Sequence, residues 1–365
     1  MALLITAGVF GYLEYWERIL WSSPSLCLVL DEPDELGEGD TCMKLRVAQR
    51  RYILRGKVVL VGGLGGGGDS GGAIPIAFEL GRLGIGVVFA GFVNARVEDI
   101  RGAEWVAGAL LRVHPGSSSG SVRFFEPSIA RLGYETYCIC CRESRSKVLE
   151  AVEWLVDNYG VETIISVDLG GDSLVFGDEP LVGSWKEDMA ALSILAEVSK
   201  KNNVKTYLAV AVLGGEAGGK GLSLPHLAEN IQRLVRDNAY HGYYEPMGTV
   251  REKTLRVLPV LLKRTPSAML TLYLDSLSGK TGTRNYHILY LQGKYTVKPY
   301  YRYHFFFDPV KVCQRSMFCQ HMMRQWRQRA RTDIIRKTIR RTPRLSLDRV
   351  VERLLKKPFI IGEHV

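Results

Sequence analysis

Two continuous apolar runs joined through a glycine-rich turn constrain the fold of this chain more than any other feature. The runs cover residues 58–62 and 86–92, and the turn holds eight glycines among the eleven residues of 62–72. A strand that is apolar at every position, rather than at alternate positions, is typical of a parallel sheet covered on both faces. The segment therefore predicts two neighbouring parallel strands joined by a helix that starts near Gly72.

Strand-like and helix-like segments alternate five times along the chain. Further strands are expected at 134–141, 163–168 and 206–213, and helices at 144–160, 184–201 and 223–240. This order predicts an α/β fold, with an open, mostly parallel, Rossmann-like sheet and helices on both faces. Residues 250–264 and 266–279 look helical, although the second segment alternates enough to be a strand. Aromatic and β-branched residues near 286–307 indicate antiparallel strands at the sheet edge.

Charge and composition divide the chain into three parts. Residues 311–365 carry fifteen lysines and arginines against four acids, which accounts for the whole net charge of +10. We interpret residues 1–42 as an N-terminal extension, with Met43 as the natural initiator, 43–310 as an α/β ligand-binding domain and 311–365 as a basic helical tail. No run reaches the roughly 20 apolar residues of a membrane span. Seven scattered cysteines without zinc-type spacing indicate the reducing cytoplasm, with Cys138, Cys140 and Cys141 buried in a strand.

Glycines and acids gather at three predicted strand ends. In an open parallel sheet, ligands bind at the carboxyl ends of the strands. Glycine leaves room for a ligand beside the backbone, and the amides at a helix start favour an anion such as phosphate. The predicted ligand-binding residues are Gly65, Gly66, Gly67, Gly68, Ser70, Gly170, Gly171, Glu216 and Lys220, and the predicted catalytic residues are Asp69, Asp168 and Asp172.

Asp168 and Asp172 suit a hard divalent cation such as Mg²⁺, which prefers carboxylate oxygens and water. Capping of turns by the same two side chains is an equally good interpretation. Ser70 and Ser173 are alternative nucleophiles, and Lys220, Lys280 and Arg284 are alternative cationic contacts for substrate. The glycine-rich turn lacks the GK[ST] of a P-loop, and the second strand lacks the terminal acid of a dinucleotide fold.

The stretches GGGGD, VDLGGDSLVFGDE with the downstream GSWKEDMA, and YYRYHFFFDP resemble a largely archaeal family known as domain of unknown function 1152. The resemblance runs from about Lys57 to Pro309. It implies a single α/β domain in which the motifs at 65–69 and 168–179 belong together, and it transfers no reaction.

These patterns favour an enzyme that binds a phosphorylated metabolite or nucleotide, with a divalent cation, for group transfer or hydrolysis. The alternative is a binding protein without turnover whose basic tail docks on RNA or another polyanion. That tail interleaves Trp326 with the arginines Arg324, Arg327, Arg329, Arg331, Arg340 and Arg341. An oligomer is compatible with either function, and the sequence does not identify the substrate.

Overall fold

The computed structural model describes residues 58–65, 67–179, 185–201, 204–218, 222–288, 291–324 and 343–365. Predictions for the N-terminal extension, Met43, Gly66 and Lys220 therefore lie outside the described residues, as does the stretch 325–342, which holds Trp326 and all the singled-out tail arginines except Arg324.

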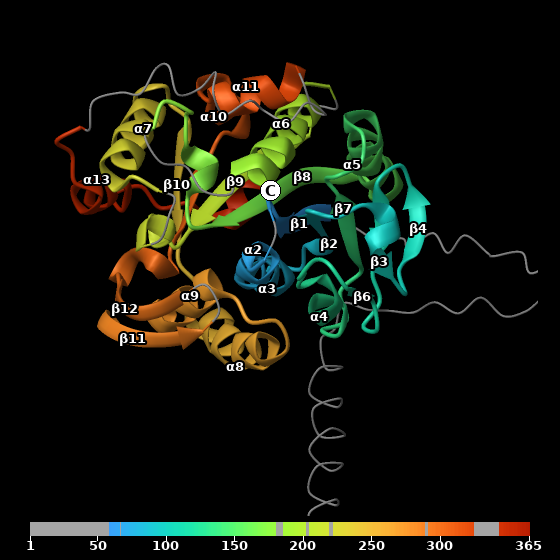
Figure 1. The fold of residues 1–365 in the computed structure, drawn as a ribbon, viewed down its shortest axis with the longest axis horizontal. Helices are drawn as coiled ribbons and strands as arrows, with labels where there is room; N and C mark the ends of the chain where they lie inside the picture. Colours follow the sequence, from blue (N-terminus) through green and yellow to red (C-terminus); the bar gives the residue numbers. More distant parts are fainter. Residues whose placement is uncertain are drawn as a thin grey trace, which may run out of the picture. The chain divides into compact units, whose positions relative to one another are not determined.

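Among the described residues, nine strands form one sheet, in the order β10-β13-β9-β8-β1-β2-β7-β5-β4 (Figure 1). The central five strands are parallel, which confirms the predicted fold class. Their bounds are β1 Val58–Gly63, β2 Gly86–Val93, β7 Thr136–Cys140, β8 Val161–Leu169 and β9 Lys205–Ala211. Alternate side chains of β1 enter different cores, Val58 and Leu60 on one face and Val59 and Val61 on the other, because helices cover both faces.

Antiparallel strands extend both sides of this parallel centre. β13 (His304–Phe307) pairs antiparallel with β9 and with β10 (Tyr240–Tyr244). On the other side lie β5 (Leu110–Arg112) and β4 (Glu104–Ala107). The predicted antiparallel addition is confirmed at β13, although β10 is the outermost strand there. The aromatic segment before it folds differently: β11 (Gly282–Ile288) and β12 (Leu291–Val297) pair with each other in a separate hairpin.

Helices form a layer on each face of the sheet (Figure 1). One layer consists of α5 (Arg145–Tyr159), α6 (Trp185–Lys201), α7 (Leu224–Arg236), α10 (Pro309–Arg315), α11 (Met317–Arg324) and α13 (Leu347–Leu354). The other consists of α2 (Asp69–Gly72), α3 (Ile74–Arg82), α4 (Glu126–Ala130), α8 (Gly248–Arg264), α9 (Ala268–Leu277) and α14 (Ile361–His364).

Two helices settle points that the sequence left open. The helix after β1 begins at Asp69, three residues before the predicted start, and continues as α3 after Ala73. The segment with alternating leucines is the helix α9, whose first turn is capped by the Ser267 hydroxyl accepting from the Leu270 amide at 3.3 Å. A hydroxyl acceptor at this position satisfies an amide that the helix itself leaves unpaired.

The described parts of 311–365 pack against the sheet domain. α10 and α11 contact α6, and α13 buries Leu347, Val350, Val351 and Leu354 against α7. The Phe359 amide donates to the Tyr243 carbonyl of β10 at 2.7 Å. The division at residue 310 stays a prediction, and so does RNA binding by the tail.

The cysteines contain one feature that the sequence analysis missed. Cys313 and Cys319 form a disulfide between α10 and α11. Cys138 and Cys140 are buried thiols of β7 as predicted, but the prediction was wrong for Cys141, which follows the strand and is half-buried. The paired cysteines lie six positions apart in the chain, and the turn at Ser316 that brings them together has no recognisable sequence signal. Cytoplasmic localisation stays a prediction. Within the described ranges, no helix has the length and apolarity required to cross a membrane.

Candidate functional site

The strand order places the candidate site where the sheet changes direction. β1 lies between β2 and β8, so the chain leaves β1 toward one side first and returns later to fill the other. The loops that follow β1 and β8 are therefore neighbours at the carboxyl edge, which is where open α/β sheets bind ligands. The Leu64 amide donates to the Val167 carbonyl at 2.7 Å and joins the two strand ends directly.

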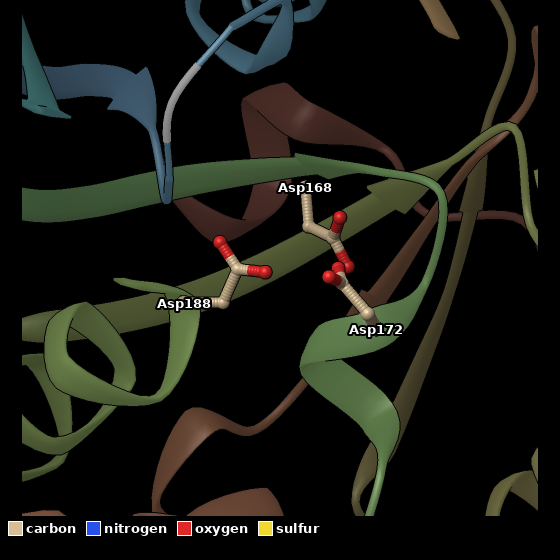
Figure 2. A group of neighbouring side chains, drawn as sticks. All are labelled: Asp168, Asp172 and Asp188. Carbon is tan, nitrogen blue, oxygen red and sulfur yellow. The ribbon is translucent and has the colours of Figure 1, made fainter. Parts of the chain in front are cut away.

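Three aspartates from separate elements meet at this edge. Asp168 lies near the end of β8, Asp172 begins the short helix η2 (Asp172–Leu174), and Asp188 lies in the first turn of α6. One carboxylate oxygen of each lies within 4.8 Å of the others, and the side chains point toward one another (Figure 2). All three are buried, with 1% to 6% of their surface exposed. We call these residues the carboxylate trio.

The structure shows the predicted capping by Asp168, whereas cation binding by this residue stays a prediction. Its carboxylate accepts hydrogen bonds from the amides of Gly171 and Ser173, at 3.4 and 3.3 Å, and from the Ser173 hydroxyl. It therefore caps the turn that carries Asp172, while still belonging to the trio. Loss of hydration, followed by the charge of Asp172, raises the pKa of Asp168 to about 7.

Asp69 joins the glycine-rich loop to the end of β8. Its carboxylate accepts from the Gly65 amide at 3.1 Å and from the Leu169 amide at 3.0 Å, and Leu169 lies 100 residues after Asp69 in the chain. Burial raises the pKa of Asp69, and the charges of Asp168 and Asp172 raise it further. This geometry makes Asp69 a group that positions the loop beside the trio.

Glu216 brings the third predicted strand end to the same place. It lies in η3 (Gly215–Gly218), and loss of hydration followed by the charge of Asp172 raises its pKa. Gly170 has φ +137°, and a Cβ there would come within 2.6 Å of Glu216 Cγ, so only glycine fits this turn. The three predicted strand ends therefore converge.

The glycine-rich loop is packed more tightly than the sequence suggested. A Cβ on Gly65 would lie 2.0 Å from Asp188 Oδ1, and one on Gly68 would lie 2.1 Å from Ser267 Oγ. These glycines allow protein segments to approach one another. Gly67 differs, because it has φ +78° and no atom within 4 Å of its Cβ position. In the described part of the loop, Gly67 has open space beside it for another molecule.

The two serines that follow aspartates donate to carboxylates. The Ser173 hydroxyl donates to Asp168, and the Ser70 hydroxyl donates to Glu126 Oε1 at 2.6 Å while accepting from the Gly63 amide at 3.1 Å. Burial raises the pKa of Glu126 to about 7. The sequence analysis missed Glu126 because it lies in α4, which does not follow any of the predicted strands.

Asp188 was also missed, and its carboxyl completes the trio. It sits in GSWKEDMA, a stretch that supported the family resemblance but was given no chemical role. Burial raises the pKa of Asp188, and the charges of Asp172, Asp168 and Asp69 raise it further. The sequence did contain a signal for Asp188: it lies in the first turn of the helix after β8, and that turn lies beside the carboxyl ends of the strands.

Three of the buried acids have no lysine or arginine partner in the part of the chain that the structure describes. The ion pairs there include none between a lysine or arginine and Asp69, Asp168 or Asp188. The predicted substrate contacts Lys280 and Arg284 each lie 3.9 Å from Asp275, an acid of α9.

Comparisons with known proteins complete this picture. No curated protein matches the chain. Among solved structures, the chain is similar to the "crystal structure of deacetylase triple mutant (Orf2*T)" from a teicoplanin biosynthetic pathway, at 8% identity and a TM-score of 0.32. That likeness covers 69% of this chain and 97% of the other, and it carries no argument about activity.

The family comparison is far more extensive. Residues 60–342 match the family described as "Protein of unknown function (DUF1152)", so the match includes all three stretches of the resemblance and ends beyond the predicted limit at Pro309. The chain therefore belongs to this family.

Proposed function

We propose that this protein is an enzyme that binds a divalent cation, Mg²⁺ foremost, at the carboxylate trio and acts on a phosphorylated metabolite or nucleotide. The observation that carries the proposal is the meeting of Asp168, Asp172 and Asp188 within 4.8 Å at the switch point of the sheet. Group transfer and hydrolysis are the reaction classes that such a cation assists, since it can polarise a phosphoryl oxygen.

The donor set suits a hard cation. Mg²⁺ binds oxygen ligands at about 2.1 Å in octahedral geometry, so neighbouring ligand oxygens lie about 3 Å apart and opposite ones about 4.2 Å apart. The three carboxylate oxygens lie within 4.8 Å of one another, so small side-chain rotations would bring them to these separations. The trio contains no sulfur or imidazole, the ligands that zinc and copper prefer.

The electrostatics also favour a cation. Carboxylates buried this close together repel one another, and without a counter-charge they take up protons instead. The raised pKa of Asp168, Asp188 and Glu216 expresses that tendency. A divalent cation would neutralise two negative charges and allow the trio to ionise near neutral pH.

An anionic ligand would then approach the bound cation from the carboxyl edge of the sheet. The open space beside Gly67 supports this side of the glycine-rich loop as the place of approach. In this proposal Asp69 fixes the loop through its two amide contacts, and Glu216 contributes a further negative charge beside Asp172.

The test is thermal unfolding of the full chain with increasing Mg²⁺. We expect the Tm to rise with Mg²⁺ concentration because a cation that binds only the folded state stabilises it. The rise should vanish in Asp168→Asn and Asp172→Asn and persist in Asp157→Asn, an exposed aspartate of α5. A panel of nucleotides and sugar phosphates should add further stabilisation only when Mg²⁺ is present. An unchanged Tm in wild-type protein up to millimolar Mg²⁺ would refute the proposal.

A further inference from the structure

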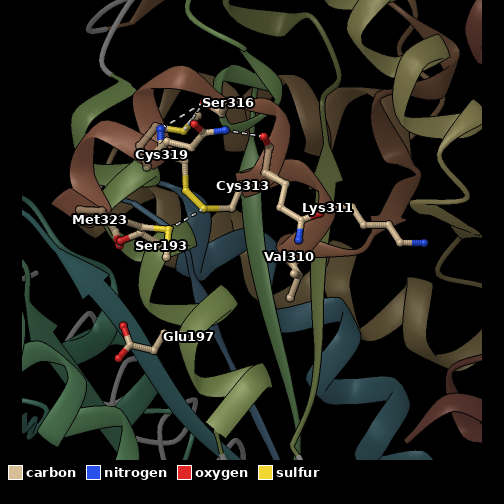
Figure 3. The surroundings of a disulfide bond; sticks show 12 residues. Ser193, Glu197, Val310, Lys311, Cys313, Ser316, Cys319 and Met323 are labelled. Atoms are coloured by element: carbon tan, nitrogen blue, oxygen red, sulfur yellow. Dashed lines mark hydrogen bonds between the residues drawn. A yellow bond between two sulfur atoms is a disulfide. The ribbon is translucent and has the colours of Figure 1, made fainter.

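The disulfide closes a short loop against the elements that carry two members of the carboxylate trio. Cys313 lies in α10 and Cys319 in α11, and the chain turns between them at Ser316 (Figure 3). Both cysteines are almost completely buried. The residues 314–318 therefore have both ends of their loop fixed by one covalent bond.

Residues 316–318 of this loop contact residues that are close in the chain to Asp172 and Asp188. The Ser316 hydroxyl lies 3.4 Å from the sulfur of Met189, the residue after Asp188 in α6. The Met317 amide donates to the Phe176 carbonyl at 2.7 Å. The Phe318 ring lies 3.2 Å from the Cβ position of Gly177, which has φ +97° and accommodates no side chain without strain.

The contacted residues lie next to the trio in the chain. Phe176 and Gly177 follow directly on the turn that Asp172 begins, and the Glu179 carboxylate accepts from both of their amides, at 2.8 and 2.7 Å. Thus the closed loop holds the Asp172 turn on one side and the Asp188 helix on the other. The cysteine sulfurs do not themselves belong to the carboxylate trio, so any effect of the disulfide on the trio passes through these contacts.

We propose that the Cys313–Cys319 couple is a redox control of the cation site. This inference rests on the proposed function. In the disulfide form, residues 316–318 are held against the segment that follows the Asp172 turn and against α6, which carries Asp188. The distances between Asp168, Asp172 and Asp188 then suit a cation. In the dithiol form the loop gains conformational freedom and holds the Asp172 turn and α6 less firmly. The affinity of the trio for the cation therefore falls.

The chemistry is a thiol–disulfide exchange with a dithiol reductant. A thiolate attacks one sulfur of the Cys313–Cys319 bond and forms a mixed disulfide, which the second thiol of the reductant resolves. The reductant is oxidised to its own disulfide, and two electrons and two protons pass to the cysteines. Because both sulfurs are buried, the exchange proceeds through local opening of the α10–α11 corner.

The experiment measures Mg²⁺ affinity of the full chain by titration calorimetry, first as the disulfide and then after reduction with a phosphine. Mass spectrometry after thiol labelling verifies each state. We expect the affinity to fall about fivefold or more on reduction, which is the lower end of common coupling between sites. The double variant Cys313→Ser/Cys319→Ser should show the weaker affinity throughout and no response to the reductant, although it retains the buried thiols of Cys138 and Cys140.

Phe318→Leu tests the path between the disulfide and the site. This variant keeps the disulfide and loses the ring contact at Gly177, so its oxidised form should bind Mg²⁺ more weakly than oxidised wild-type protein. Equal Mg²⁺ affinity in the two redox states of the wild type would overturn the inference and leave the proposed function intact. Absence of Mg²⁺ binding in both states would refute the proposed function itself. Circular dichroism confirms that each variant remains folded.

Discussion

At the scale of single residues, Gly65 brings the glycine-rich loop close to the carboxylate trio. A Cβ there would come 2.0 Å from Asp188 Oδ1, a separation that no real pair of such atoms adopts. Gly65→Ala must therefore displace the Asp188 carboxylate. We expect the variant to fold and to lose most of its stabilisation by Mg²⁺, measured as the Tm shift between cation-free and saturating conditions.

The matched control for this substitution is Gly81→Ala. Gly81 lies in α3 with nothing within 4 Å of its Cβ position, and alanine is a better helix former than glycine. Its response to Mg²⁺ should equal that of the wild type. A full Mg²⁺ response in Gly65→Ala would mean that Asp188 does not bind the cation.

Residues at the site were predictable where they followed a strand. Asp168 lies at the end of β8, and Asp69, Asp172 and Glu216 follow β1, β8 and β9. The meeting of such strand ends at one edge is a general property of parallel sheets. Asp188 and Glu126 come from helices. Their approach to the site depends on how α6 and α4 pack. The place of Asp188 in the first turn of α6 was a local signal, whereas no local pattern indicated Glu126.

At the scale of elements, α13 is the part of the chain whose attachment matters most for the interpretation of the C-terminus. Leu354 is 2% exposed in the core that α13 shares with α7. We expect Leu354→Ala to lower the free energy of unfolding by about 2–4 kcal/mol, because truncation removes buried apolar contact and leaves a cavity. Urea denaturation followed by circular dichroism measures the change.

Arg349→Ala, on the exposed side of the same helix, should change the free energy of unfolding by less than about 0.5 kcal/mol. If Leu354→Ala were equally harmless, the helix would be a detachable part of a tail and not a part of the domain core.

Strands and helices were predictable to different degrees. The five apolar runs gave the five parallel strands because a strand covered on both faces needs an apolar residue at every position. β4, β5 and β10 are partly polar and were missed, since half-exposed strands near an edge have weaker patterns. The sequence could not decide between helix and strand at 266–279, because the answer depended on which side of α9 is buried, and burial is a tertiary property.

At the scale of the whole molecule, the buried acids link stability to pH. The pKa of Asp168 is raised to about 7, whereas an unfolded aspartate titrates near 4. Between these values the folded chain retains a proton that the unfolded chain has released, so the contribution of Asp168 to stability is largest below about pH 4 and is lost as pH rises through 7. Asp168→Asn removes this proton uptake.

We therefore expect the free energy of unfolding of Asp168→Asn, relative to wild type in Mg²⁺-free buffer, to increase from pH 5 to pH 8 by on the order of 1 kcal/mol or more. Urea denaturation at four pH values measures the difference. Asp157→Asn should give a difference that is flat with pH. A flat difference for Asp168→Asn as well would show that this carboxyl titrates normally in the folded chain.

The position of β13 has a consequence for how the protein is made. Residues 304–307 insert between β9 and β10, and the Phe359 amide bonds to β10 only a few residues from the end of the chain. During synthesis, both neighbours of β13 leave the ribosome long before the strand that joins them. A nascent chain of this protein must therefore keep one side of β9 without its final neighbour until residues 304–307 have been synthesised, and a chaperone that shields strand edges would be most useful in that interval.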